Sequence, residues 1–193
     1  MIGQGDRRDD ATVPGGDDLQ HAMRELSAEL RAQREELEEA AEQIERANRS
    51  LPEVALEFLY RGDIIRVAVG QRSWIGVVTH VGTGVMTLQT QAGAEIDVAY
   101  EGLSSIRVVE RAMSGGRSRT TKHPGELVAR LREVETSGEA VELGARDLVP
   151  SLEGTVEVVA SSHLEFRARD GSEWVVPLTE VGYLIRSPGR PLR

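Results

Sequence analysis

Apolar residues recur at a heptad spacing in residues 18–49. The predicted seam contains Met23, Leu26, Leu30, Leu37 and Ile44. Between these positions the segment consists of strong helix formers, many of them acidic. We therefore predict a long coiled-coil helix over residues 18–49. Residues 1–17 are rich in Gly and Asp and have almost no apolar content, which predicts a disordered tail.

An isolated helix cannot bury an apolar stripe, so the predicted helix needs a partner. A parallel homodimer is the interpretation that we prefer. The alternative is a surface helix that lies along the following β-unit of its own chain. The second of the two seam positions in each heptad holds Gln33, Ala40 and Ala47, which are polar or small and bury little apolar surface. Gln33 either fixes the register of a coiled coil or faces solvent.

From residue 50 onward the period of the pattern changes to that of β-strands, and the same pattern occurs twice. One constant shift in numbering places Gly76 on Gly154 and Val98 on Val176 without a gap. Turn glycines and apolar positions keep their spacing, as repetition of one supersecondary unit requires. We expect Gly76 and Gly154 to lie at matching bends, where a side chain would meet the neighbouring backbone.

Each copy is predicted to be one helix followed by five short strands. Ser50 and Glu53 form a candidate capping box before a short helix at 53–60. The strands of the first copy are expected at 64–69, 74–81, 85–91, 95–100 and 105–109. In the third strand Met86, Leu88 and Thr90 alternate with polar residues, as in a half-buried strand. The second copy repeats this with Leu164, Phe166 and Ala168 inside.

The predicted boundaries follow from these patterns. The first unit covers residues 50–111, the second covers 123–186, and a tail occupies 187–193. The polar linker at 112–122 contains Arg117, Arg119 and Lys122. These three residues are the candidate nucleic-acid contacts, although small polar residues form linkers in proteins of any function.

A helix followed by five strongly bent antiparallel strands resembles the Sm-like fold, including the bacterial Hfq-type proteins. The resemblance is carried by the sequences WIGVV at 74–78, MTL at 86–88 and YEGLSSI at 100–106. It implies a mainly β protein with helices, in which two tandem Sm-like small β-barrels follow the coiled-coil helix. The residues that read RNA in the family are not matched. Gly82 and Met86 stand where the family has Asp and Asn, and Glu101 and Gly102 where Hfq-type proteins have Lys and His.

Composition and charge limit the classes of function that we expect for this chain. The chain has 193 residues, no cysteine and a net charge of −9. Most of the acidic excess lies in residues 1–50, and no segment is strongly basic. A chain that is acidic overall argues against broad nucleic-acid binding. Four dispersed histidines, His21, His80, His123 and His163, do not predict a metal site. No catalytic motif is present, so we expect neither an enzyme nor a cofactor.

Trp74 and Trp174 do not occupy equivalent positions, and we expect both to fill cores rather than to stack on a partner. No apolar run approaches a spanning helix and the N-terminus resembles no signal peptide, so we expect a cytoplasmic protein. Lys122 is the only lysine, which suggests a high-GC bacterial genome.

The functional prediction is a non-catalytic adaptor or regulatory protein. It self-associates through the coiled coil and presents two small barrels to an unidentified protein partner, away from membranes. The alternative is an Sm-like protein that binds RNA or another single-stranded nucleic acid.

Overall fold

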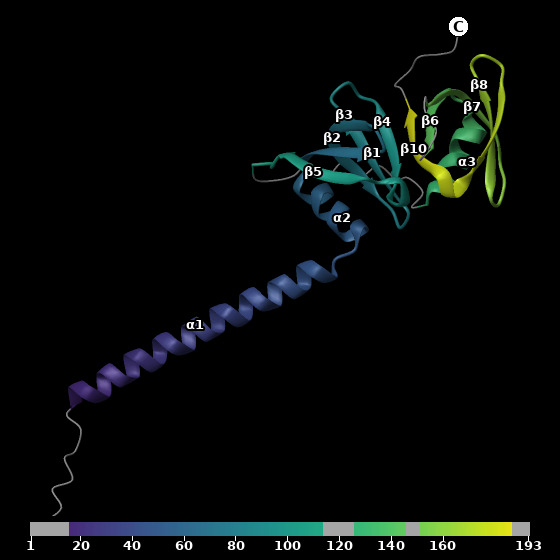
Figure 1. Ribbon diagram of the computed structural model, residues 1–193. Helices are drawn as coiled ribbons and strands as arrows, with labels where there is room; N and C mark the ends of the chain where they lie inside the picture. The colour runs from purple at the N-terminus through teal and green to yellow at the C-terminus, as the bar shows by residue number, and fades with distance from the viewer. Residues whose placement is uncertain (1–15, 114–125, 146–150, 187–193) are drawn as a thin grey trace, which may run out of the picture. The chain divides into compact units, whose positions relative to one another are not determined.

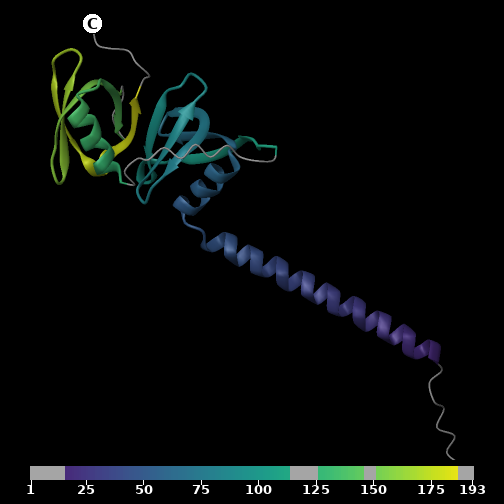
Figure 2. The ribbon, with the colours of Figure 1, turned by 180° about the vertical axis from the view of Figure 1, so that it is seen from behind.

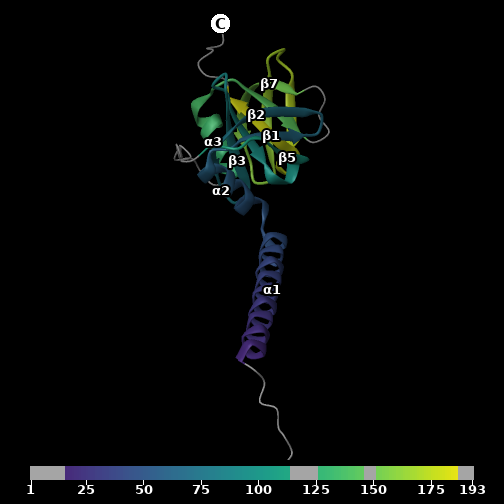
Figure 3. The ribbon, with the colours of Figure 1, turned by 90° about the vertical axis from the view of Figure 1, so that its left-hand side faces the viewer.

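The computed structural model describes residues 16–113, 126–145 and 151–186 (Figure 1). The chain divides into two units, the first ending at Arg49 and the second beginning at Ser50. The first unit contains α1, a helix over Gly16–Asn48. Figure 3 shows it as one uninterrupted helix. The predicted long helix is therefore present and begins two residues before the predicted start.

The second unit is built on one antiparallel sheet of ten strands, in the order β5-β1-β2-β3-β4-β10-β6-β7-β8-β9. The first five strands are β1 (Ile64–Val69), β2 (Arg72–Val81), β3 (Val85–Thr90), β4 (Glu95–Ala99) and β5 (Ser105–Glu110). The second five are β6 (Val141–Ala145), β7 (Leu152–Val159), β8 (His163–Ala168), β9 (Glu173–Pro177) and β10 (Val181–Arg186).

A helix precedes each set of strands. Helix α2 (Leu51–Arg61) begins with the predicted capping box, because the side chains of Ser50 and Glu53 bond reciprocally with the backbone at the helix start. Helix α3 (Leu127–Ser137) has no such cap. Both helices end at a glycine in the left-handed conformation, Gly62 and Gly138. Short 3₁₀ turns, η1 (Tyr100–Gly102) and η2 (Leu178–Glu180), precede β5 and β10.

The shift that places Gly76 on Gly154 also relates the pairings among the second, third and fourth strands of each half. The helix and the first strand are offset by two residues fewer, because Gly62 corresponds to Gly138, and Ile65 and Val141 lie opposite Gly76 and Gly154. In the first half Gly76 lies opposite Thr90, and in the second half Gly154 lies opposite Ala168. The ladder between the second and third strand is irregular after Val78 in one half and after Val156 in the other. The two halves therefore share strand order, register and the position of a bulge.

The expectation of two Sm-like barrels is wrong. The strands form a single open sheet, in which β5 and β9 are the two edges. Strand β4 does not close onto the edge of its own half. It pairs with β10 of the other half instead, with Glu95–Val98 opposite Tyr183–Arg186 (Figure 1). The backbone groups of β4 that would close a barrel thus join the two halves instead. We call this ladder between β4 and β10 the joint.

Each half has its own apolar core beneath its own helix. Ala55, Phe58 and Leu59 of α2 pack with Met86 and Leu88 in the first core. Leu131 and Val134 of α3 pack with Leu164 and Phe166 in the second. Figure 2 shows α3 lying against the strands of the second half. The predicted alternation of β8 is confirmed, because Leu164, Phe166 and Ala168 are buried and Glu165 and Arg167 are exposed.

Gly76 and Gly154 occupy close-packed backbone positions, as expected. A Cβ atom on Gly76 would meet the backbone carbonyl of Gln89, and one on Gly154 would meet that of Arg167. Only glycine lets the neighbouring strand approach so closely.

Candidate interaction surfaces

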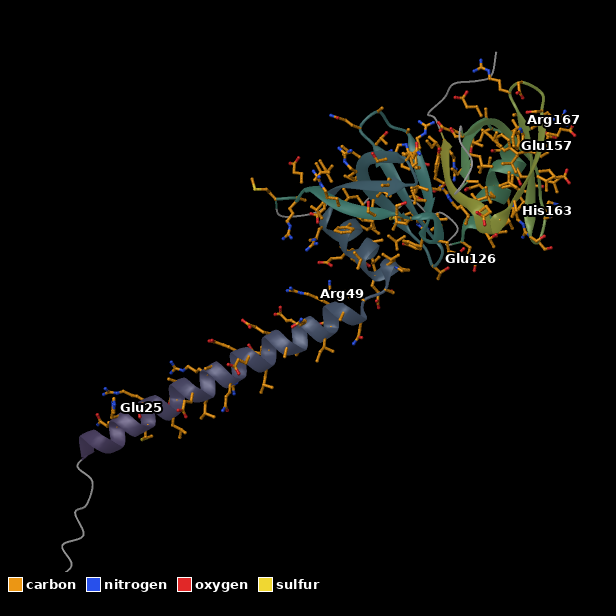
Figure 4. The ribbon with its side chains drawn as sticks, viewed as in Figure 1. Glu25, Arg49, Glu126, Glu157, His163 and Arg167 are labelled. Atoms are coloured by element: carbon orange, nitrogen blue, oxygen red, sulfur yellow. The ribbon has the colours of Figure 1, made fainter. Side chains whose placement is uncertain are left out.

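The predicted seam of α1 is exposed. Met23, Leu26, Leu30, Leu37 and Ile44 have between 57% and 71% of their surface accessible. Ion pairs between successive turns lie on the polar part of the helix, where Arg46 contacts Glu42 at 3.0 Å and His21 contacts Glu25 at 3.2 Å. Side chains project from the helix along its length, with Glu25 labelled in its N-terminal third and Arg49 just after its last residue (Figure 4). The seam is an apolar stripe available to a partner.

The candidate nucleic-acid contacts Arg117, Arg119 and Lys122 lie outside the described residues. Nucleic-acid binding therefore stays a prediction from the sequence. Filter binding with mixed RNA at low salt tests it, because binding through phosphate contacts weakens steeply with salt. Arg117→Ala/Arg119→Ala should abolish any retention that depends on these residues.

A buried ionic cluster lies at the joint. Asp97 of β4 and Arg130 of α3 are both fully buried. The Asp97 carboxylate accepts hydrogen bonds from Arg130 Nε at 3.1 Å and Nη2 at 2.9 Å, and from Thr87 Oγ1 at 2.6 Å. Arg186 Nη2 of β10 donates to the same carboxylate at 3.1 Å. Four elements of the two halves therefore meet at one buried carboxylate.

The local sequences explain how these side chains reach one another. Arg130 lies one helical turn before Val134, which belongs to the second core, so the arginine is on the buried side of α3. Arg186 ends β10 in the ladder position opposite Glu95 of β4. Glu133, one helical turn after Arg130, accepts from Arg130 Nη1 at 2.8 Å and from Arg186 Nη2 at 3.3 Å. Two carboxylates thus face two guanidinium groups, which makes the burial of charge tolerable.

Reasoning from the sequence missed this cluster. The alternation predicted for the third strand places Thr87 on its polar side, and no pattern in the sequence predicts that Asp97 is buried. Both are buried. The equivalent residues of the second half, Val175 and Glu165, are exposed. A single Asp at a position where the other repeat has Val was the available signal that the two positions have different surroundings.

A second polar group connects the halves at the other end of the joint. Glu142 of β6 accepts from Arg72 at 2.9 Å and from Ser151 Oγ at 2.6 Å. The Tyr183 hydroxyl lies 3.3 Å from the same carboxylate. Burial raises the pKa of Tyr183, and the neighbouring Glu142 carboxylate adds to that shift.

The two tryptophans have different surroundings. Trp74 packs against the first core, with its ring centroid 4.5 Å from that of Tyr183 in an edge-to-face arrangement. The core role expected of Trp74 is therefore confirmed. Trp174 lies on the edge strand β9, where 40% of its surface is exposed, so the same expectation is wrong for Trp174. Its indole Nε1 donates to Ser172 Oγ at 2.9 Å.

The described residues contain no group of three or more His, Cys, Asp or Glu side chains that would hold a metal ion. On β7 and β8, Glu157 and Arg167 form an exposed pair, with 3.4 Å between Oε1 and Nε (Figure 4). No helix in the described part of the chain is both long and apolar enough to cross a membrane. The surfaces that stand out are the α1 seam and the two sheet edges.

Comparison with protein-family models, with curated proteins and with solved structures found no match for this chain.

Proposed function

We propose that this chain is a non-catalytic adaptor or regulatory protein. It self-associates through the α1 seam and presents the ten-stranded sheet to a protein partner. The observation that carries the proposal is the exposed heptad of α1. Burying a large apolar side chain contributes about 1.5–3 kcal/mol. Five such side chains on one helix therefore favour pairing over solvation.

The charges beside the seam support a parallel arrangement. With Met23 and Leu30 at the first heptad position, Glu29 and Arg34 fall at the two flanking positions that meet across a parallel coiled coil. In a parallel pair in register, Glu29 of one helix faces Arg34 of the other, which is an attractive contact. Gln33 then lies in the seam, where a polar residue favours one register at some cost in stability.

The sheet unit suits a role in protein binding better than one in phosphate binding. Its surface carries paired charges of both signs, such as Glu157 with Arg167 and Glu153 with Arg169. Each exposed arginine of these pairs already has a carboxylate neighbour. The net charge of −9 also opposes association with a polyanion.

Sedimentation velocity of the full chain tests self-association. Leu30→Glu/Leu37→Glu places two charges in the seam and should dissociate the pair formed by α1. Ala28→Glu/Ala32→Glu is the matched control, because it adds the same two charges on the opposite side of the helix. We expect the control to sediment as the natural chain does.

Two outcomes would contradict the proposal. The first is a natural chain that sediments as a monomer at tens of micromolar. The second is a seam variant that sediments in the same way as its control. Circular dichroism gives a second readout, because a coiled coil that dissociates also loses much of its helix signal. We expect this loss in the seam variant and not in the control.

A further inference from the structure

The sheet has two free edges that are equivalent to the two strands of the joint. Strand β9 is the counterpart of β4, and β5 is the counterpart of β10, by the shift that relates the repeats. Within the chain β4 pairs with β10. Among the described residues β9 pairs only with β8, and β5 only with β1. One chain therefore makes this contact once, between β4 and β10. It also carries the two strands that a second such contact needs, β9 and β5.

Equivalent positions on β4 and β9 differ sharply in exposure. Ile96 has 1% of its surface accessible, whereas Trp174 at the same repeat position has 40%. Asp97 has none accessible, whereas Val175 has 68%. Large apolar side chains on an unpaired strand edge are unusual in a protein that stays alone, because such an edge invites another strand.

The register of the joint can be transferred to the outer edges. It places Glu173–Val176 of one copy opposite 105–108 of the next. Val175 then faces Ile106, and Trp174 faces Arg107, an arrangement suited to a cation–π contact. Pro177, which lacks an N–H group, lies just beyond the four paired positions, where it does not interrupt the ladder.

The ionic cluster has an apolar counterpart at the outer edges. Asp97 and Arg186 correspond to Val175 and Val108 by the shift that relates the strands. Arg130 corresponds to Val54 when α2 and α3 are aligned at the glycines that end them, Gly62 and Gly138. Val54 and Val108 are only partly buried and lie against the first core. Asp97 and the two arginines that bond to it are thus each replaced by valine, so that charge faces charge at the joint and valine faces valine at the outer edges.

This difference also determines which strand can occupy which edge. If β9 took the place of β4, Val175 would leave Arg130 buried without its carboxylate. A buried charge that loses its partner is strongly destabilising. The strands of the joint and the strands of the outer edges therefore cannot replace one another. Such a penalty for the wrong partner keeps repeated interfaces specific.

We propose that β9 of one copy pairs with β5 of a second copy, antiparallel and in the register of the joint, through Val175, Val54 and Val108. The contact uses different surfaces on the two copies, so it is heterologous and propagates into a closed ring or an open array. It does not depend on α1 and does not rest on the proposed function.

The contact between copies is expected to be wider than the joint at one end. Gly102 lies so close to β10 that a Cβ atom on it would be 2.6 Å from Cα of Gly182. Glu180 and Ser104 hold the equivalent positions at the outer edges. Their side chains keep that end of the two copies further apart.

Cysteine cross-linking tests the register, because the natural chain has no cysteine. Leu178 N donates to Ser162 O, and Ala168 N donates to Ser172 O. Even-numbered residues of β9 therefore direct their backbone toward β8, and Trp174 lies at a non-hydrogen-bonded position of the outer contact. Opposite Cα atoms are about 4.5 Å apart there, within reach of a disulfide.

Trp174→Cys/Arg107→Cys should therefore form disulfide-linked multimers on mild oxidation of the full chain, reversed by reductant. Trp174→Cys/Val109→Cys is the matched control. Val109 lies on the same side of β5 two residues further along, about 6.6 Å away and beyond the reach of a disulfide. Failure of the first pair to cross-link, or equal cross-linking of both pairs, would overturn the proposal.

The mass of the assembly provides a second test, performed in the Leu30→Glu/Leu37→Glu background so that α1 pairing does not contribute. We expect this background to remain larger than a monomer at high concentration. Adding Val175→Lys should raise its apparent dissociation constant about tenfold or more, because the lysine would be buried against valines. Val158→Lys, at an exposed apolar position of β7, is the control and should change little.

A background that is monomeric at every concentration would overturn edge pairing without affecting the proposal for α1. So would equal association of the Val175→Lys and Val158→Lys variants. Conversely, edge pairing that persists in a natural chain whose α1 does not pair would refute the proposed function alone.

Discussion

Asp97 and Val175 occupy the same position of a repeated unit, but their surroundings are opposite. Asp97 lies at the joint of the two halves, where it is buried and receives hydrogen bonds from Arg130 and Arg186. Val175 lies on a free edge and is exposed. In the proposed contact between copies the same backbone pairing is surrounded by apolar side chains instead of ionic ones, and this difference would determine which strand each edge accepts.

The largest effect is expected from removing the carboxylate at the joint. Asp97→Ala leaves the fully buried Arg130 facing an empty space, with only Glu133 to compensate. The free energy of unfolding should fall by about 3–5 kcal/mol, measured by urea denaturation. Val175→Ala, at the equivalent exposed position, is the control and should cost no more than about 0.5 kcal/mol at low protein concentration. Equal losses for the two variants would remove the contrast between these positions.

A double variant sharpens the comparison by giving the joint the residues of the outer edge. Asp97→Val/Arg130→Val removes both charges and installs the pair found at Val175 and Val54. Apolar replacement of a buried ion pair is often neutral, whereas loss of one partner is not. A double-mutant cycle should therefore give a favourable coupling of about 2–3 kcal/mol between the two substitutions. Simple additivity of the single losses would show that the pair does not act as a unit.

The two strand glycines are expected to respond alike, since they lie at the same place in each half. Gly76→Ala and Gly154→Ala direct a methyl group against the backbone of the adjacent strand. Each should lower the free energy of unfolding by about 1–3 kcal/mol. Gly84→Ala is the control, because a Cβ atom there has no atom within 4 Å. If either variant were as stable as Gly84→Ala, the close approach of the strands would be refuted.

A smaller effect concerns Tyr100 in η1, where the second half has Leu178. Burial raises the pKa of Tyr100 to about 12, from an ordinary value of 10.0. The unfolded chain therefore releases this proton before the folded chain does. The stabilisation is complete below pH 10 and is lost as the pH rises toward 12.

The urea concentration at the midpoint of unfolding should accordingly decrease as the pH is raised from 10 to 12. Tyr100→Phe should make this decrease less steep. Tyr60→Phe on the exposed part of α2 is the matched control. An unchanged slope in Tyr100→Phe would show that ionisation of this hydroxyl does not contribute.

The sequence allowed much of the local structure to be predicted and little of the long-range pairing. Alternation in β8 and the capping box at Ser50 are local patterns, and both appear in the structure as expected. The partner of β4 is not encoded locally, since closing a barrel and joining two repeats require the same alternation. The Sm-like resemblance favoured closure, and the open sheet contradicts it.

The ionic cluster was missed for the same reason. The burial of Thr87 and Asp97 depends on Arg130, a residue of the other half that no spacing connects with them. Only the comparison of the repeats, with Asp97 against Val175, contained that information. Deviations between copies are therefore as informative as the positions that the copies share.

The central claim is that one type of strand contact is made inside the chain and again between copies. Hydrogen exchange of backbone amides, measured across a range of protein concentrations in the Leu30→Glu/Leu37→Glu background, tests it most directly. We expect the amides of 95–98 and 183–186 to be protected at all concentrations. The amides that point to the free edges, Glu173 and Val175 of β9 and the alternate residues of 105–108 that face away from β1, should gain protection as the concentration rises. Rapid exchange at both outer edges at every concentration would contradict the account.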